Sequence, residues 1–319
     1  MREWSGPLSP RTFIQPAGGS ALRIGYPCIN RGIGCSANRT FRLASYSDER
    51  LLATARGNLA YLEKILAWNV QHGILFFRIT SDLIPFASHP VCTAGWQEEF
   101  RDEFARLGEF IRSNGIRISM HPDQFIVLNA PDPDVVARSI AELTYHAAVL
   151  DLLLLDGTAK IQLHVGGMYG DREGSIARFV QVYDTLDPAI RRRLVIENDD
   201  RRFTAADCLA IHGETKIPVL FDVFHHACNS SGEGVPEMIQ RVTGTWKRAD
   251  GTMMVDYSSQ HPEKRAGSHA DHIDTKDFSQ FLAISKPVDM DIMLEIKDKE
   301  ASALAAIAIA KADSRFVLQ

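Results

Sequence analysis

Short apolar segments that run directly into a histidine or a carboxylate recur along this chain, and they constrain its fold more than any other feature. Each segment has the length and residue content of a buried strand. A charged or imidazole side chain at the end of a buried strand costs desolvation energy unless another group binds it. A first segment, residues 76–79, runs into Ser81-Asp82, and six others end at His121, His164, Glu197, Asp222, Asp256 and Glu295. Six such endings, in three residue types that bind divalent metals, predict a metal centre where parallel strands converge.

Strand and helix patterns alternate along the whole chain. Strands are predicted at residues 21–26, 74–79, 116–121, 160–165, 193–198, 217–224, 252–257 and 290–296. Helices are predicted at residues 48–73, 96–113, 134–155, 175–186, 204–211, 235–243, 275–284 and 299–312. Repeated strand-then-helix units predict an α/β fold, a TIM (β/α)8 barrel, as one domain over residues 21–319. A doubly wound open sheet is the alternative, but it would gather ligands at one switch point. Residues 1–20, rich in Pro, Gly and Ser, are expected to be a flexible leader.

Composition limits the setting in which this chain acts. It has 319 residues, of which 45% are hydrophobic and 24% charged, so it can bury a large core. The net charge of −5 does not suggest a non-specific polyanion binder, although bound metal would cancel carboxylate charge locally. The five cysteines form no CxxC pair, which favours free thiols and a cytoplasmic location. No signal peptide and no membrane-spanning run is present, so we expect no membrane partner. We also expect a monomer.

The carboxyl ends of the strands of a TIM barrel form one rim, where function resides. The strand-end residues, together with His225 just beyond Asp222, should therefore surround one mouth. A lone histidine at a strand end is more often a hydrogen-bonded structural residue, and a lone carboxylate there is commonly a helix cap or an ion-pair partner. Together they would stay unsatisfied without a cation. The mixed set suits manganese, zinc or iron and is too large for one tetrahedral ion, so we expect two or three divalent transition-metal ions, manganese first.

Two reaction classes suit such a centre. A cluster of divalent ions can generate hydroxide at neutral pH and bind the attacking and leaving oxygens of a phosphodiester. Isomerisation or epimerisation of an open-chain sugar by a metal pair is the alternative.

Seven short motifs narrow this choice. They are Arg23-Ile24-Gly25-Tyr26-Pro27-Cys28-Ile29-Asn30, Phe77-Arg78-Ile79-Thr80-Ser81-Asp82-Leu83-Ile84-Pro85, His121-Pro122-Asp123-Gln124-Phe125, Leu163-His164-Val165-Gly166-Gly167, Ile196-Glu197-Asn198-Asp199, Phe221-Asp222-Val223-Phe224-His225-His226 and Leu294-Glu295-Ile296-Lys297-Asp298-Lys299-Glu300. In this order they resemble the UV damage endonucleases, from about residue 21 to 312. The resemblance implies a TIM barrel related to endonuclease IV, a trinuclear centre that often holds manganese, and incision of damaged double-stranded DNA immediately 5′ to UV photoproducts. Activity on other helix-distorting lesions is left open.

The same resemblance implies roles for individual residues. It implies seven metal ligands, namely His121, His164, Glu197, Asp222, His225, His269 and Glu295. His89 matches a histidine near the scissile phosphate, so we expect His89, Glu197 and Glu295 to take part in catalysis. Gln124 and Phe125 match a pair that fills the gap left by damaged bases, and Tyr26 and Asn30 match residues that face the lesion. An aromatic side chain and an amide on a rim loop fit intercalation, although Phe125 as ordinary core is the alternative.

One strand departs from the better-known members of the family. Met254 stands where they carry a lysine, and Asp256 stands where they carry a metal-binding histidine. Asp256 can still bind a cation through oxygen, so we include it as a ligand, whereas Met254 cannot replace a lysine. His261 and His272 are expected to contact solvent or to lie behind the ligands. A lesion-binding protein with weakened catalysis is therefore a further alternative.

DNA binding also needs positive charge near the rim. We expect candidates in or near the loops that follow strands: Arg31, Arg39, Arg42, Arg172, Arg201, Arg202, Lys247, Arg248, Lys264 and Arg265.

Overall fold

The strands predicted from the sequence pair side by side, all in parallel, and close into one barrel. This computed structural model describes residues 22–316; the predicted leader at residues 1–20 lies outside them. The strand order around the barrel is β1-β10-β9-β8-β7-β6-β5-β4. Their bounds are β1 Leu22–Pro27, β4 Phe76–Ile79, β5 Arg117–Met120, β6 Lys160–His164, β7 Leu194–Glu197, β8 Val219–Asp222, β9 Met253–Tyr257 and β10 Met290–Leu294. The predicted TIM barrel is confirmed.

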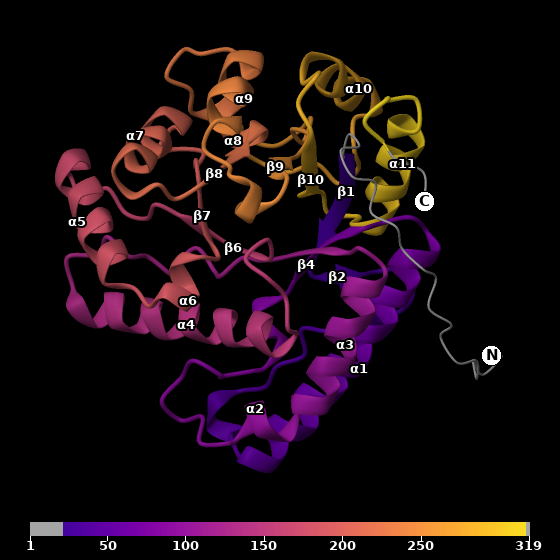
Figure 1. Cartoon of the computed structure of the whole chain (residues 1–319), viewed down its shortest axis with the longest axis vertical. Helices are drawn as coiled ribbons and strands as arrows, with labels where there is room; N and C mark the ends of the chain where they lie inside the picture. The colour runs from indigo at the N-terminus through magenta and orange to yellow at the C-terminus, as the bar shows by residue number, and fades with distance from the viewer. Residues whose placement is uncertain (1–21, 317–319) are drawn as a thin grey trace.

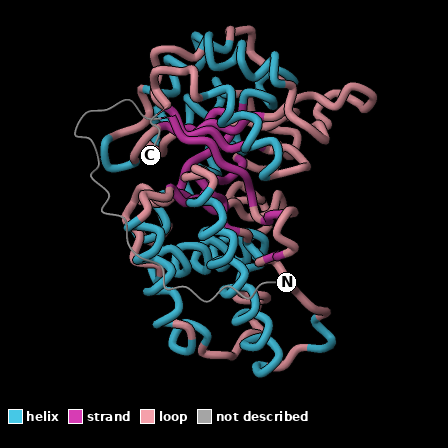
Figure 2. Tube along the Cα trace, turned by 90° about the vertical axis from the view of Figure 1, so that its right-hand side faces the viewer, coloured by secondary structure: helices cyan, strands magenta, loops and turns pink. Residues whose placement is uncertain are grey.

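Helices surround the barrel and connect one strand to the next (Figure 1). Figure 2 shows the strands gathered in the middle of the molecule, with helices on either side. The helices are α1 Asp48–Gln71, α2 Trp96–Glu99, α3 Arg101–Ser113, α4 Pro133–Leu152, α5 Arg172–Thr185, α6 Pro188–Arg191, α7 Ala205–Thr215, α8 Val223–Cys228, α9 Val235–Thr243, α10 Thr275–Ile284 and α11 Glu300–Ala310. Side-chain caps begin several of them. Ser47 accepts a hydrogen bond from the Arg50 amide at α1, and Thr204 forms a capping box with Asp207 at α7.

Smaller elements complete the chain. The first loop after β1 holds a two-stranded antiparallel sheet, β2 (Ile29–Asn30) with β3 (Cys35–Ser36). Three short 3-10 helices are η1 Leu43–Ser45, η2 Ser81–Leu83 and η3 Arg248–Asp250. No helix within residues 22–316 is long and apolar enough to cross a membrane.

Two predicted elements need correction. The helix predicted at residues 96–113 is divided at Phe100, whose φ of −109° and ψ of 15° are not helical. The strand predicted at residues 217–224 ends at Asp222, because that carboxylate accepts a hydrogen bond of 2.7 Å from the His225 amide and so caps α8. The carboxylate predicted to bind metal therefore also begins the helix that carries His225.

The barrel interior is layered, and the two-residue period of a strand creates the layers. Five buried apolar side chains, Phe76, Val195, Leu220, Met254 and Met293, form one cluster inside the barrel. Two residues further along the same five strands, on the same interior face, stand Arg78, Glu197, Asp222, Asp256 and Glu295. The apolar cluster is the floor of the site, and Met254 belongs to this floor.

Candidate metal centre

The ends of six neighbouring strands bring the predicted ligands together. His164, Glu197 and Asp222 are the last residues of β6, β7 and β8, while His121 and Glu295 directly follow β5 and β10. Their ligand atoms form three overlapping groups, each with all atoms within 4.8 Å of one another: His121 with His164 and Glu197, Glu197 with Asp222 and His225, and Asp222 with Asp256 and Glu295. Shared members link all three groups.

Glu197 lies at the centre of this arrangement and is buried. Its Oε2 is 3.4 Å from Nε2 of His121 and 3.8 Å from Nδ1 of His164. Its other oxygen, Oε1, is 3.2 Å from Nδ1 of His225. The two carboxylate oxygens therefore face different imidazoles, which is the arrangement expected of a carboxylate that bridges two cations.

Backbone contacts fix Asp222 and His225 in place. The side chain of Asn198 donates to the Asp222 carbonyl at 2.9 Å and accepts from the Asp222 amide at 3.0 Å. Nδ1 of His225 lies 3.0 Å from the Asn198 carbonyl and 3.1 Å from Asp222 Oδ2. Asn198 follows Glu197 directly, so one short segment orients three of the predicted ligands.

The electrostatics of the site favour a cation. Burial raises the pKa of Asp222 to about 8, with Glu197 and Glu295 adding to the effect and His225 opposing it. Burial would lower the pKa of His225, but Asp222 and Glu197 raise it to about 11. Burial would also raise the pKa of Glu197, but His164, His225 and His121 hold it well below its usual range. These groups depend on protons to balance their charges, and divalent ions would balance them directly.

Buried polar atoms without partners support the same conclusion. Within the described part of the chain, Nδ1 of His121, Nδ1 of His164 and Oδ1 of Asp256 are buried and have no hydrogen-bond partner. Each such atom costs about 1–3 kcal/mol when it stays unsatisfied. Imidazole and carboxylate donors of this kind fit divalent transition metals.

Arg78 and Gln162 reach the same centre, although neither is among the predicted site residues. Arg78, on β4, is buried and forms ion pairs with Asp256, at 2.7 Å, and with Glu295. Gln162, on β6, donates hydrogen bonds to Glu197 and, at 2.6 Å, to Asp256 Oδ2. Their spacing in the sequence could have identified them. Side chains two residues apart on a strand share one face, and Arg78 lies two residues after Phe76 while Gln162 lies two residues before His164.

Asp256 therefore differs from the other predicted ligands. Its Oδ2 already accepts hydrogen bonds from Arg78 and Gln162, and only Oδ1 is free to bind an ion. Its role as a ligand stays a prediction.

The three histidines beyond β9 lie in different surroundings. The ring of His269 is centred 6.3 Å from that of His225, and its Nδ1 donates to the Glu295 carbonyl at 2.7 Å, which leaves Nε2 free. It lies beside the three ligand groups but in none of them, so its role as a ligand also stays a prediction. His272 is exposed and 2.9 Å from Asp298, and His261 is 3.5 Å from Asp271; neither belongs to the three ligand groups.

The residues predicted to contact DNA fall into two classes. Phe125 is 74% exposed and Gln124 is exposed, on the loop after β5, so the alternative of Phe125 as core is wrong. Tyr26 and Asn30, in contrast, are buried. The Tyr26 hydroxyl donates to Asn69 at 2.6 Å and accepts from Asn30 at 2.9 Å. Their predicted contact with a lesion stays a prediction; in this structure their polar groups hold the first loop against α1.

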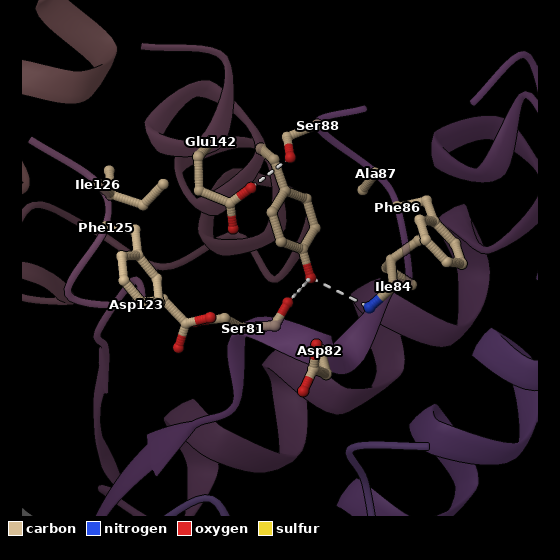
Figure 3. Close-up of a pocket in the computed structure, with 11 residues that line it drawn as sticks. Ser81, Asp82, Ile84, Phe86, Ala87, Ser88, Asp123, Phe125, Ile126 and Glu142 are labelled. Carbon is tan, nitrogen blue, oxygen red and sulfur yellow. Dashed lines mark hydrogen bonds between the residues drawn. The ribbon is translucent and has the colours of Figure 1, made fainter. Parts of the chain in front are cut away.

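A cavity of about 230 Å³ opens beside Phe125. Figure 3 shows Phe125 and Ile126 on one side of it and Phe86 on the other, with Glu142 and Ser88 at the top of the view. Burial, together with Asp123 and Glu142, raises the pKa of Asp82 in its wall. The cavity is lined by Asp82, Asp123 and Glu142, and these carboxylates disfavour a phosphate group inside it.

Two further predictions concern exposed residues. His89 is exposed, and its Nδ1 accepts from the Val91 amide at 3.0 Å. Within residues 22–316 no hydrogen bond or ion pair joins it to the ligands, so its catalytic role stays a prediction. Lys247 and Arg248 were predicted to lie near the rim, and this prediction is wrong. The adjoining Asp250 binds Lys160 and Arg117 at the starts of β6 and β5, which places both residues at the end of the barrel opposite the metal centre.

Comparison with known proteins identifies the family. The model of the family described as UV-endonuclease UvdE matches residues 22–314. The UV DNA damage endonuclease of Clostridium perfringens (strain 13 / Type A) is 40% identical over 288 residues, which cover 90% of this chain and 70% of that protein. The enzyme of the same name from Bacillus mycoides (strain KBAB4) is 32% identical over 296 residues, covering 90% and 93%.

Solved structures agree with this. The crystal structure of SacUVDE has a TM-score of 0.89 and 43% identity, covering 92% of this chain and all of that one. D-psicose 3-epimerase from Clostridium cellulolyticum H10 has a TM-score of 0.54 and 15% identity, covering 78% and 92%, and shares the fold alone. This chain belongs to the UV-endonuclease UvdE family.

Proposed function

We propose that this protein is a metal-dependent DNA repair endonuclease that hydrolyses the phosphodiester immediately 5′ to UV photoproducts in double-stranded DNA. Its centre would hold two or three divalent transition-metal ions, manganese first and zinc or iron as alternatives. The observation that carries the proposal is the position of Glu197, whose two oxygens face separate imidazoles. The free thiols of Cys28, Cys92, Cys208 and Cys228 support a reducing, cytoplasmic setting. We expect a monomer.

The residues of the centre have distinct tasks in this proposal. Divalent ions, when bound, would supply a hydroxide at neutral pH and would neutralise the charge that develops on the phosphodiester oxygens. His121 and His164 would hold one ion with Glu197, and His225 with Asp222 a second. Glu295, which forms an ion pair with Arg78, would complete the coordination next to Asp222. Gln162 and Asn198 orient these ligands through hydrogen bonds.

Recognition of damage would depend on the exposed rim loop. Gln124 and Phe125 project from the surface next to the metal ligand His121, so they can enter a duplex while its backbone crosses the centre. The whole chain has a net charge of −5, and divalent ions bound at the mouth would offset the charge of the carboxylates there.

The two alternatives are less well supported. Sugar isomerisation or epimerisation rests on a fold shared at 15% identity, and it gives the exposed Phe125 no task. Weakened catalysis rests on Met254 and Asp256, but Met254 belongs to the apolar floor and two complete ligand groups do not involve Asp256.

An end-labelled duplex that carries one photoproduct tests the proposal. Protein loaded with manganese should cut the damaged strand once, immediately 5′ to the lesion, and chelation should abolish the cut. Glu237→Gln, at an exposed carboxylate on α9, should cut like the parent. Binding to the damaged duplex without any cut would support the lesion-binding alternative instead, and a cut elsewhere would contradict the proposed position.

A further inference from the structure

Lys299 has a backbone conformation that residues other than glycine rarely adopt. It connects β10 to α11 with a φ of 56° and a ψ of −111°. Lys216 also has a positive φ, of 62°, but its ψ of 14° is the ordinary left-handed conformation at the end of a helix. Lys299 lies outside that favoured region, and such strain persists only where neighbouring contacts enforce it.

Contacts on both sides of Lys299 enforce this conformation. The carboxylate of Glu300 accepts hydrogen bonds from the amides of Arg31, at 2.9 Å, and Gly32, at 2.6 Å. The Lys299 amide donates to the Ile296 carbonyl at 3.2 Å, and its carbonyl accepts from Ala303 at 3.1 Å. The first loop after β1 and the start of α11 thus hold Lys299 between them.

The ammonium group of Lys299 has no partner in the described part of the chain. Lys299 is half-buried, and no hydrogen bond or ion pair within residues 22–316 involves its side chain. Lys299 stands in the short loop between the end of β10 and the start of α11, the same loop that carries Glu295, so it lies on the rim that holds the candidate metal centre. By contrast, Lys297 pairs with Asp271 at 2.7 Å, and the buried Lys160 pairs with Asp250 at 2.6 Å. A half-buried cation that is held without an anion at an active-site mouth is suited to an anion from outside.

We propose that Lys299 is a substrate-binding residue whose ammonium group binds a non-bridging oxygen of the scissile phosphate, immediately 5′ to the photoproduct. The inference rests on the proposed DNA substrate of this site. Phosphate has to approach a mouth built largely of carboxylates, and a fixed lysine next to Glu295 lowers the electrostatic cost of that approach. In this proposal, the strained backbone of Lys299 serves to fix the position of its ammonium group.

Binding of two matched duplexes tests the proposal. Both carry a photoproduct, and the linkage immediately 5′ to it is either a charged phosphorothioate or a neutral methylphosphonate. For the charged duplex, Lys299→Met should weaken binding several-fold and reduce the slope of log K against log salt by about 1. For the neutral duplex, Lys299→Met should bind like the parent, and Lys216→Met should bind both duplexes like the parent.

Two further variants separate binding from folding. Lys299→Gly should raise the melting temperature because it removes the strain, yet bind the charged duplex as weakly as Lys299→Met. Lys299→Arg should keep most of the affinity. Metal content should equal that of the parent in all three variants. Unchanged binding of the charged duplex by Lys299→Met, or loss of metal from the variants, would overturn the proposal. A parent protein that binds damaged DNA but does not cut it would overturn the proposed function and leave the result for Lys299 standing.

Discussion

Arg78 donates a hydrogen bond of 2.7 Å to Asp256, and both side chains are buried inside the barrel, in the same layer as Glu197, Asp222 and Glu295. Burial would lower the pKa of Arg78, but Asp256 and Glu295 raise it, so it stays charged. Burial would raise the pKa of Glu295, and Arg78 is the main group that holds it below its usual range. Arg78 therefore keeps Glu295 ionised before any metal binds, whereas burial raises the pKa of Asp256 well above its usual range although Arg78 opposes the effect.

Removing this cation should destabilise the protein. Arg78→Met removes the cation that pairs with the buried Asp256 and the half-buried Glu295, and breaking a buried ion pair costs about 3–5 kcal/mol. Asp256→Asn should cost less, because the amide oxygen can still accept from Arg78 and Gln162. Urea unfolding of chelated protein measures both. Arg101→Met, in an exposed pair with Glu98, is the control and should change little. A larger loss for Asp256→Asn than for Arg78→Met would contradict this account.

Metal affinity should rise with pH. Below about pH 8 the Asp222 carboxyl holds a proton that a cation must displace, because its pKa is raised to about 8. The proton on His225, whose pKa is raised to about 11, is displaced over the same range and above it. The dissociation constant for manganese should therefore fall from pH 6 to pH 9, by about tenfold per unit for each proton displaced. The steeper fall should lie below pH 8. Titrations at four pH values measure this, and a constant that is flat or rises with pH would show that protons and metal do not compete here.

The rim loop should contribute to recognition and not to metal binding. Gln124→Ala combined with Phe125→Ala removes an exposed aromatic side chain, and stacking on a base contributes about 1–3 kcal/mol. The double variant should prefer damaged over intact duplex less strongly, with unchanged metal content and melting temperature. Ile284→Ala, at an exposed apolar residue at the end of α10, is the control. Loss of metal from the double variant, or an undiminished preference for damage, would refute the role of this loop in recognition.

Incision should depend on Glu197 more than on any exposed carboxylate. Glu197→Gln keeps the shape of the side chain but removes the charge between two groups of imidazoles. We expect incision of the photoproduct duplex to fall by at least about a hundredfold. Single-turnover rates of the variant, compared with Glu237→Gln, measure the effect. Near-normal incision with full metal content would exclude Glu197 as a bridging ligand.

The barrel and most of the centre could be predicted because two local signals coincide. Apolar strands end in ligand-type residues, and parallel strands place those ends on one rim. For His121, His164, Glu197, Asp222 and Glu295 the sequence pattern is therefore enough to predict that they meet.

Other features depend on contacts that local sequence does not contain. Arg78 and Gln162 look like ordinary polar residues of a strand, and only barrel closure places them opposite Asp256. The burial of Tyr26 depends on Asn69, which lies on α1 and is 43 residues away. Helix α8 has six residues, too few for a periodic pattern to appear.

The most direct test of the account is the metal content of the protein, purified without chelator and measured by elemental analysis before any dialysis. Shared residues link three groups of candidate ligands, so the parent should carry at least two transition-metal ions per chain. Glu197→Gln should carry fewer than the parent, because Glu197 belongs to two of the groups. A parent value below one ion per chain, in folded protein, would contradict the central claim that this barrel is built around a multinuclear metal centre.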